Sequence, residues 1–179
     1  MNRIKIRTLS ENDEKIFLEA MLRSEAFHHP WVKPPVSSEV FQDYYLKYQK
    51  LNNVCYLVCN ELDDIVGVFN ISEIILGVFK SAYLGYFAVQ GYENKGYMSQ
   101  GLKLVLEQVF TQHGLHRLEA NIQPNNLQSI YLAQNNGFQK EGYSPRYLKI
   151  DDEWKDHERW AITYEDWVNF KNQDKVENK

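Results

Sequence analysis

Residues 82–113, AYLGYFAVQGYENKGYMSQGLKLVLEQVFTQH, decide the fold of this chain. The part from Ala82 to Val89 is mostly apolar and aromatic and predicts a buried strand. From Met98 to His113, apolar residues recur at helical spacing and predict a helix. The loop between them carries Gly91 and Gly96, which interrupt both patterns. A strand that turns directly into a helix predicts a β-α-β crossover, and a helix N-terminus beside a strand end favours an anionic ligand.

The flanking sequence alternates between strand and helix patterns. Before this stretch we expect a strand at 4–8, a helix from Ser10, a helix from Ser37 or Ser38 to about Leu51, and strands at 54–59 and 65–75. After it we expect a strand at 117–122, a helix at 129–136 closed by Gly137, a hairpin of 138–150 and 154–163, and a helix from Tyr164 to Phe170. This order changes from an antiparallel meander to β-α-β crossovers. It predicts an α/β (α+β) fold: a mixed, mostly antiparallel, twisted sheet of about seven strands with helices on both faces.

Length and composition are those of one domain. The chain has 179 residues, of which 44% are hydrophobic and 25% charged. We expect a single domain over residues 1–170, followed by a polar tail at 171–179. The formal net charge of −4 argues against overall electrostatic binding to nucleic acid or to an anionic membrane surface. No segment approaches the roughly 20 apolar residues of a membrane span, and the charged N-terminal segment lacks the apolar region of a signal peptide.

The two cysteines, Cys55 and Cys59, indicate a reducing compartment. On one strand they lie about 13 Å apart, which is too far for a disulfide bond. We therefore expect two buried thiols and a cytoplasmic location.

The loop before the predicted helix carries groups suited to an anion. Lys95 adds a positive charge, and Gly96 allows the backbone to approach a ligand closely. The loop lacks the Gly-x-Gly-x-x-Gly spacing of dinucleotide sites and the Gly-Lys-Ser/Thr sequence of nucleoside triphosphate sites. Its pattern fits a phosphate-binding turn, and it fits equally well a plain connection in which Gly91 and Gly96 only supply special backbone angles.

A second polar segment follows the strand predicted at 117–122. Amide and hydroxyl side chains crowd into residues 121–129, NIQPNNLQS, next to the start of a short helix. Helix capping accounts for Asn126 or Ser129 individually. It does not account for so many amides beside the end of one strand, which favours a ligand site there.

Together these segments resemble the GNAT superfamily of N-acetyltransferases, and within it the ribosomal-protein N-terminal acetyltransferases RimJ and RimL. The acetyl-CoA signature of the family, Gln/Arg-x-x-Gly-x-Gly/Ala, falls on residues 93–98, where Glu93 and Met98 depart from it. The resemblance runs from about Ile65 to Trp167. Further matches to RimJ are Tyr83-Leu84-Gly85-Tyr86, Lys95-Gly96-x-Met98, His116-Arg117, Pro124-x-Asn126, Gly137-Phe138-x-Lys140-Glu141-Gly142-Tyr143 and Trp154-x-Asp156-His157.

The resemblance implies transfer of an acetyl group from acetyl-CoA to a primary amine, most commonly the N-terminal amine of a protein, such as a ribosomal protein. It implies that backbone amides at the loop and helix start hold the pyrophosphate, and that pantetheine pairs with the preceding strand like an added strand. The cofactor-binding residues expected on this basis are Phe87, Ala88, Val89, Glu93, Asn94, Lys95, Gly96, Tyr97, Met98, Ser99, Asn126 and Ser129.

The resemblance also suggests catalytic residues. Many members place a tyrosine five residues before the Phe of the Gly-Phe pair, and that position is Ala133 here. RimL-like enzymes instead use a glutamate as base and a serine as acid. These fall on Glu73 in Phe69-Asn70-Ile71-Ser72-Glu73 and on Ser129 in Asn126-Leu127-Gln128-Ser129. We expect Glu73 to accept the amine proton, through a water molecule, and Ser129 to protonate the departing thiolate.

On the acceptor side, we expect Trp31, Tyr86 and Tyr131 to contact the amine substrate. We expect no metal, because His28 and His29 are sequence neighbours whose side chains diverge, and no carboxylate or cysteine stands at ligand spacing. Two other functions fit the same scaffold: an acetyltransferase for a small amine such as an antibiotic or a polyamine, and a CoA-binding sensor without turnover. A monomer and a homodimer are both compatible with the sequence.

Overall fold

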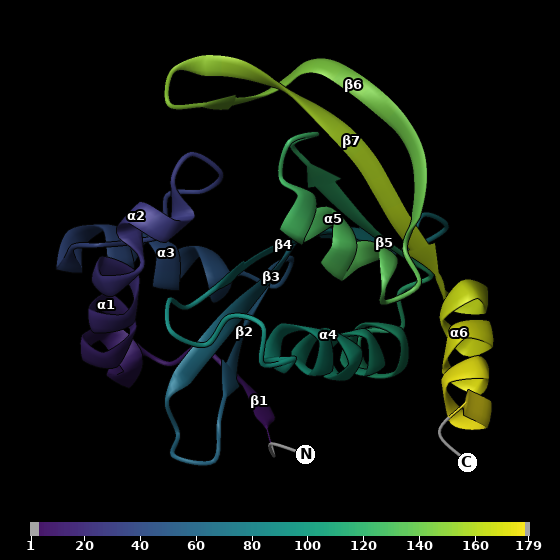
Figure 1. Ribbon diagram of the computed structural model, residues 1–179, viewed down its shortest axis with the longest axis horizontal. Coiled ribbons are helices and arrows are strands. Elements are labelled where there is room, and N and C mark those ends of the chain that lie inside the picture. The colour runs from purple at the N-terminus through teal and green to yellow at the C-terminus, as the bar shows by residue number, and fades with distance from the viewer. Residues whose placement is uncertain (1–3, 178–179) are drawn as a thin grey trace.

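The computed structural model of the protein describes residues 4–177, with residues 174–177 described by their backbone alone. Its centre is a seven-stranded sheet in the order β1-β2-β3-β4-β5-β7-β6 (Figure 1). The strands are β1 (Lys5–Thr8), β2 (Val54–Cys59), β3 (Ile65–Ile75), β4 (Ser81–Ala88), β5 (Arg117–Ile122), β6 (Gln139–Ile150) and β7 (Glu153–Thr163). The helices are α1 (Glu14–Arg23), α2 (Glu25–His28), α3 (Ser38–Tyr48), α4 (Tyr97–Glu107), α5 (Leu127–Gln134) and α6 (Tyr164–Glu177). Neighbouring strands are antiparallel except β4 and β5, so the predicted mixed, mostly antiparallel sheet is confirmed.

Each face of the sheet packs against its own helices, as the sequence predicted. On one face, α4 and α6 bury Leu102, Val105 and Trp167 in a core with the strands. On the other face, α1 and α3 bury Phe17 and Phe41. Figure 1 shows α1, α2 and α3 on one side of the molecule and α4, α5 and α6 on the other. For α1, α3 and α4, the apolar residues at helical spacing in the sequence form the stripe that faces the sheet.

The parallel pair in the middle of the sheet is short. β4 and β5 pair only over Ser81–Tyr83 and Arg117–Glu119. Beyond Tyr83, β4 still pairs with β3 as far as Ala88, but in the described part of the chain no strand pairs with its other edge there. An open strand edge presents N–H and C=O groups that another extended chain can use. The second half of β4, beyond Tyr83 and as far as Ala88, therefore has one edge that is open to another extended chain.

Some element boundaries differ from the prediction. α5 begins at Leu127 rather than at Ser129, because the Asn126 side chain accepts the Ser129 backbone N–H and caps the helix earlier. α6 continues to Glu177, so most of the segment expected as a polar tail is helical, and residues 178–179 lie outside the described residues. The helix that ends at Glu107 is prolonged by a π-helical turn at Gln108–Gln112.

The cysteines match the prediction, since Cys55 and Cys59 are buried free thiols. Burial raises the pKa of Cys55 to about 12, so this thiol is protonated at neutral pH. Within residues 4–177, no helix is both long and apolar enough to cross a membrane. Among the side chains that the structure describes, no group of three or more His, Cys, Asp and Glu is placed to hold a metal ion.

Two buried histidines and one half-buried histidine are expected to make the stability of this fold depend on pH. Burial lowers the pKa of His28, His113 and His157 below the ordinary value of 6.5. The unfolded chain therefore takes up protons at pH values where the folded chain does not, and protonation favours unfolding. We expect the free energy of unfolding to fall as the pH is lowered from about 7.5 to about 5.5, measured by urea denaturation. A free energy of unfolding that stays constant or rises over this range would contradict the assignment.

Candidate functional site

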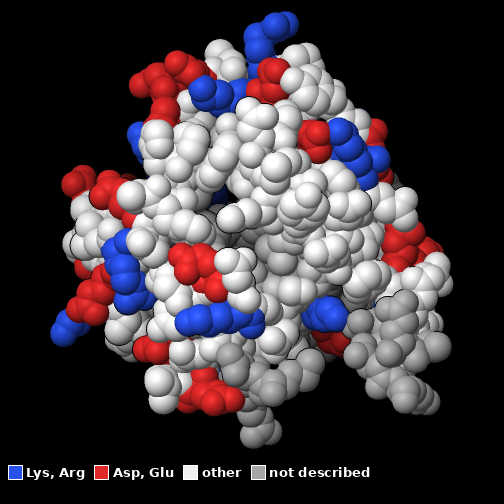
Figure 2. All heavy atoms as spheres, viewed as in Figure 1, with Lys and Arg blue, Asp and Glu red and all other residues white. Residues whose placement is uncertain are grey.

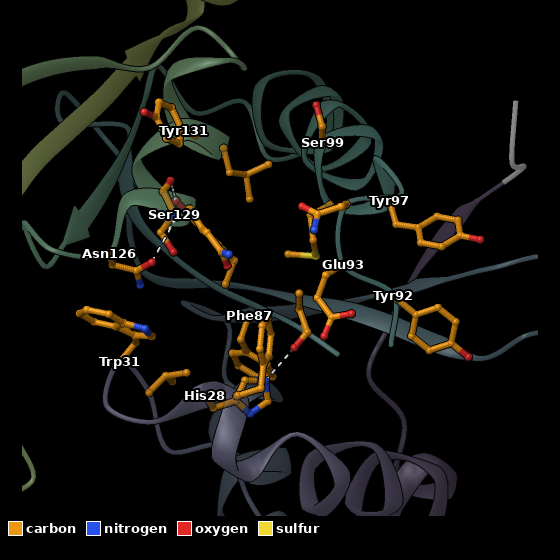
Figure 3. Close-up of a pocket in the computed structure, with 18 of the residues that line it drawn as sticks. His28, Trp31, Phe87, Tyr92, Glu93, Tyr97, Ser99, Asn126, Ser129 and Tyr131 are labelled. Carbon is orange, nitrogen blue, oxygen red and sulfur yellow. Dashed lines mark hydrogen bonds between the residues drawn. The ribbon is translucent and has the colours of Figure 1, made fainter. Parts of the chain in front are cut away.

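A cavity of about 350 Å³ opens at the free edge of β4. It lies where α2 and the segment after it, β4, the loop before α4 and the start of α5 come together (Figure 3). The lining residues are Phe27, His28, Trp31, Val32, Tyr86, Phe87, Ala88, Tyr92, Glu93, Asn94, Gly96, Tyr97, Met98, Ser99, Asn126, Gln128, Ser129, Tyr131 and Leu132. The structure thus brings together the two polar segments singled out in the sequence. Of the predicted site residues, Glu73, Val89 and Lys95 do not line it.

The start of α4 forms one wall and is suited to an anion. Gly96 precedes the helix with a φ of 77°, in the left-handed region that glycine adopts without strain. The first backbone N–H groups of an α-helix have no carbonyl of the helix to bond, and here they include those of Met98 and Ser99. Ser99 adds a hydroxyl, which is held by the fully buried Asn136, whose Nδ2 lies 3.2 Å from Ser99 Oγ.

The loop before α4 is held by its own side chains. The Glu93 carboxylate accepts the backbone N–H of Gly91 at 2.8 Å. This bond lowers the pKa of Glu93, so the side chain is ionised at neutral pH. Lys95 Nζ donates to the Gly91 carbonyl at 2.8 Å and lies 5.3 Å from the centre of the Tyr92 ring. The Lys95 ammonium group is therefore bonded within the loop, whereas the negatively charged Glu93 lines the cavity.

Met98 occupies a space that a glycine on β3 leaves. A Cβ atom added to Gly67 would lie 2.1 Å from Met98 Sδ, far inside van der Waals contact. Gly67 pairs with Ala88 across the β3–β4 ladder, so Met98 reaches the sheet beside the open edge. The missing side chain at position 67 explains how this helix start carries a long side chain where the family signature has Gly or Ala.

The open edge of β4 offers its backbone to the cavity at Ala88. The Val89 N–H donates to the Val66 carbonyl at 3.0 Å. Because backbone groups of alternate strand residues point to the same side, Phe87 and Val89 turn theirs to β3, whereas Ala88 turns its own to the open edge. Of the three residues predicted to pair with a ligand, Phe87, Ala88 and Val89, Ala88 turns its backbone groups to the open edge, and Phe87 also lines the cavity.

His28, at the end of α2, lies against this edge. Its Nε2 donates to the Ala88 carbonyl at 2.7 Å (Figure 3), and its ring meets the Phe87 ring edge-on with centroids 5.4 Å apart. Burial lowers the pKa of His28, so the imidazole is neutral and carries its proton on Nε2. In the sequence His28 is considered only as a metal ligand, a role that the spacing of its neighbours argues against. No local pattern could reveal a contact with Ala88, which is distant along the chain.

Ser129 lies on the opposite wall, in the first turn of α5 (Figure 3). Its backbone N–H donates to Asn126 Oδ1 at 3.2 Å, and its carbonyl accepts the Tyr86 hydroxyl at 2.7 Å. The Asn126 and Tyr86 side chains therefore fix the backbone of Ser129, a residue that lines the cavity. Ala133, where many family members have a tyrosine, is fully buried.

The side of the cavity formed by α2 and the segment after it is apolar. Phe27, Trp31 and Val32 line it there, and Tyr131 of α5 lines it from the other side. Figure 2 shows a deep hollow on this face of the molecule with a mostly uncharged rim. The β6–β7 hairpin arches toward the segment after α2 (Figure 1), and its Asp151 forms an ion pair with Lys33 of that segment.

Glu73 lies outside the cavity. It is exposed near the end of β3, where the register with β4 shifts between Ser72 and Ile75. Its φ is 53°, and its backbone N–H donates to Asn53 Oδ1 at 3.2 Å. The structure therefore does not bring Glu73 and Ser129 together.

Comparison of the sequence with known proteins gives consistent matches. Residues 3–139 match the family model described as an acetyltransferase (GNAT) domain. The chain is 39% identical over 105 residues to ribosomal protein uS5-alanine N-acetyltransferase of Escherichia coli (strain K12), covering 59% of this chain and 54% of that protein. It is 36% identical over 100 residues to the probable N-acetyltransferase YjcK of Bacillus subtilis (strain 168), covering 56% of this chain and 55% of that protein. The chain thus spans about half the length of the curated relatives it matches.

Solved structures share the fold. The ribosomal-protein-S5-alanine acetyltransferase from Vibrio fischeri aligns over 93% of this chain and 96% of its own, with a TM-score of 0.84 and 23% identity. RimJ from Mycobacterium smegmatis, in complex with CoA-disulfide, aligns over 90% and 82%, with a TM-score of 0.83 and 24% identity. Spermidine N-acetyltransferase from Vibrio cholerae, in complex with CoA and spermine, aligns over 93% and 98%, with a TM-score of 0.79 and 18% identity. At these identities the likeness concerns the fold alone.

Proposed function

This chain belongs to the acetyltransferase (GNAT) family, and from that premise we propose that it transfers an acetyl group from acetyl-CoA to the N-terminal α-amino group of a protein, such as a ribosomal protein. The Escherichia coli relative named for acetylating an alanine of ribosomal protein uS5 supports this acceptor class. We further propose alanine or serine as the first residue of the acceptor.

The observation that carries the acceptor class is the chemistry of the cavity wall. Phe27, Trp31 and Val32 are apolar, and Glu93 is the only carboxylate among the lining residues that the structure describes. Glu93 is already bonded to the Gly91 N–H. A polyamine carries several positive charges, which need several compensating carboxylates when they leave water. A protein N-terminus carries one amine followed by neutral peptide, and this suits an apolar wall better.

The residues present suit acetyl-CoA, which supplies the acetyl group as an activated thioester. The first-turn amides of α4 would hold the pyrophosphate, and Gly96 leaves the backbone open to it. The open edge of β4 before Ala88 would pair with a pantetheine amide, as an added strand does. Asn126 and Ser129 would stand on the other side of the thioester.

We assign Ser129 to the leaving group. As the neutral amine nitrogen bonds to the acetyl carbonyl carbon, the carbon–sulfur bond breaks, and Ser129 donates its Oγ proton to the departing sulfur. The Ser129 oxygen, left as an alkoxide, takes a proton from solvent, and the new amide nitrogen releases its extra proton to solvent. The Ala88 N–H, on the open edge, is placed to stabilise the negative charge on the carbonyl oxygen.

The resemblance assigns Glu73 the role of general base, but Glu73 does not line the cavity. Since its carboxylate is exposed and away from Ser129, we expect Glu73→Gln to keep kcat within about threefold of the unchanged protein, measured by thiol release from acetyl-CoA. A loss of about a hundredfold would return Glu73 to the mechanism as a base that acts through water.

Glu93 is expected to weaken cofactor binding, because its ionised carboxylate lines the cavity beside the proposed pyrophosphate site. Glu93→Gln keeps an oxygen for the Gly91 N–H and removes the charge. We expect the KM for acetyl-CoA to fall about threefold at low ionic strength, with a smaller difference at high ionic strength because salt screens the repulsion. Glu19→Gln, on the exposed side of α1, changes the total charge equally and serves as the control. An unchanged or higher KM in Glu93→Gln would contradict this account.

The acceptor class is tested by thiol release with a panel of amines. We expect turnover with peptides that begin with a free alanine or serine, and little with the same peptides blocked at the N-terminus, with spermidine, or with an aminoglycoside. Preferential turnover with spermidine or the aminoglycoside would favour a small-amine acetyltransferase. Tight CoA binding without thiol release for any amine would favour a CoA-binding sensor.

A further inference from the structure

Tyr86 crosses the gap between β4 and α5. It lies on β4 beyond Tyr83, where pairing with β5 ends, and its ring packs against the fully buried Phe69 with centroids 5.8 Å apart. Its hydroxyl donates to the Ser129 backbone carbonyl at 2.7 Å. Burial raises the pKa of Tyr86, so the hydroxyl keeps its proton and remains a donor over the whole neutral range. With its hydroxyl committed in this way, Tyr86 does not offer that group to an acceptor amine.

Tyr86 and Asn126 hold Ser129 from two directions. Asn126 bonds the Ser129 N–H as the cap of α5, and Tyr86 bonds the Ser129 carbonyl from the sheet. One rotatable bond joins the Ser129 hydroxyl to this backbone, so the position of Oγ follows the position of the backbone. The cap fixes Ser129 relative to its own helix, whereas Tyr86 fixes it relative to β4.

The distance between β4 and α5 matters for the proposed reaction. The open edge of β4 would hold the thioester, and α5 carries the proposed proton donor. No strand pairing joins β4 to β5 at this level in the described chain. The Tyr86–Ser129 hydrogen bond runs directly from one element to the other.

We propose that Tyr86 is a positioning residue for acetyl transfer, which holds Ser129 at the separation from the β4 edge where its hydroxyl reaches the departing sulfur. This inference rests on the proposed role of Ser129 and adds a residue that acts only through it. A small displacement of a reacting group lowers the rate of the chemical step without weakening binding. We therefore expect loss of the Tyr86 hydroxyl to lower kcat.

Tyr86→Phe removes the hydroxyl and keeps the ring on Phe69. We expect kcat with an N-terminal alanine peptide to fall about tenfold, while the KM for acetyl-CoA stays within about twofold. Tyr56→Phe is the matched control, because it removes a tyrosine hydroxyl bonded to His113 Nε2 at 2.7 Å in the same core cluster, away from the cavity. Both variants are assayed well below their melting temperatures, and we expect kcat of the control to be unchanged.

A double variant separates this proposal from the role of Ser129 itself. We expect Tyr86→Phe to cause no further loss in a Ser129→Ala background, because the hydroxyl it positions is gone. If Ser129→Ala lowers kcat and Tyr86→Phe does not, or if the two losses multiply, the positioning role is overturned and the role of Ser129 stands. If Ser129→Ala leaves kcat unchanged, the proposed acid is wrong and the positioning role falls with it.

Discussion

Ser129→Ala is expected to lower kcat about a hundredfold, at the lower end of what a positioned general acid contributes. The thiolate then leaves without a proton from the protein. Because the backbone of Ser129 is bonded by Asn126 and Tyr86 rather than through its own hydroxyl, the variant keeps the shape of α5. We therefore expect the dissociation constant for CoA, measured by calorimetry, to change less than about twofold.

The matched control for this prediction is Ser38→Ala at the start of α3, whose hydroxyl bonds Glu14 and not the cavity. We expect its kcat to equal that of the unchanged protein. If Ser129→Ala weakens CoA binding in proportion to the loss of rate, Ser129 acts as part of the cofactor site. That result would remove it as the acid.

Gly67→Ala is expected to destabilise the protein and to disturb the start of α4. The added Cβ would lie 2.1 Å from Met98 Sδ, so the Met98 side chain must move or α4 must shift from the sheet. Overpacking of this kind costs about 1–3 kcal/mol of the free energy of unfolding, measured by urea denaturation. Since Met98 lines the cavity, we also expect the KM for acetyl-CoA to rise.

A second change tests the cause of that loss. Met98→Ala in the Gly67→Ala background removes the atom in contact and is expected to recover most of the lost stability. Gly85→Ala on β4 is the control, since the nearest atom to its added Cβ is Asn70 Cβ at 3.9 Å, an ordinary contact. A Gly67→Ala protein as stable as the unchanged one, or a loss that Met98→Ala does not recover, would contradict the packing described here.

Much of the fold follows from local patterns in the sequence. The alternating and apolar runs of β2, β3 and β5 end where the sequence predicted, because turn residues bound them closely. The end of α6 was not predicted, because a polar helix without a strong apolar stripe resembles a tail in sequence. The start of α5 was misplaced because Asn126 caps the helix while Ser129, two residues into it, has the same capping chemistry.

The candidate site, like the fold, could be predicted from the sequence only in part. Its two segments stand out in sequence because glycines and amides cluster at a helix start, and both line the cavity. His28 and Gly67 act through contacts with Ala88 and Met98 that are distant along the chain, and no periodicity encodes them. Lys95, predicted to bind the cofactor, lies outside the cavity lining and donates to the Gly91 carbonyl, a partner that its charge alone does not reveal.

The most direct test of the proposed function is where the acetyl group goes. A peptide with a free N-terminal alanine and an internal lysine is incubated with the protein, acetyl-CoA and an equal concentration of spermidine, and fragment-ion mass spectrometry locates the product. We predict acetylation of the α-amino group of the peptide, with the lysine and the spermidine largely unmodified. Acetyl groups found mainly on spermidine or on the lysine, or on no acceptor, would contradict the account of this protein as an N-terminal acetyltransferase.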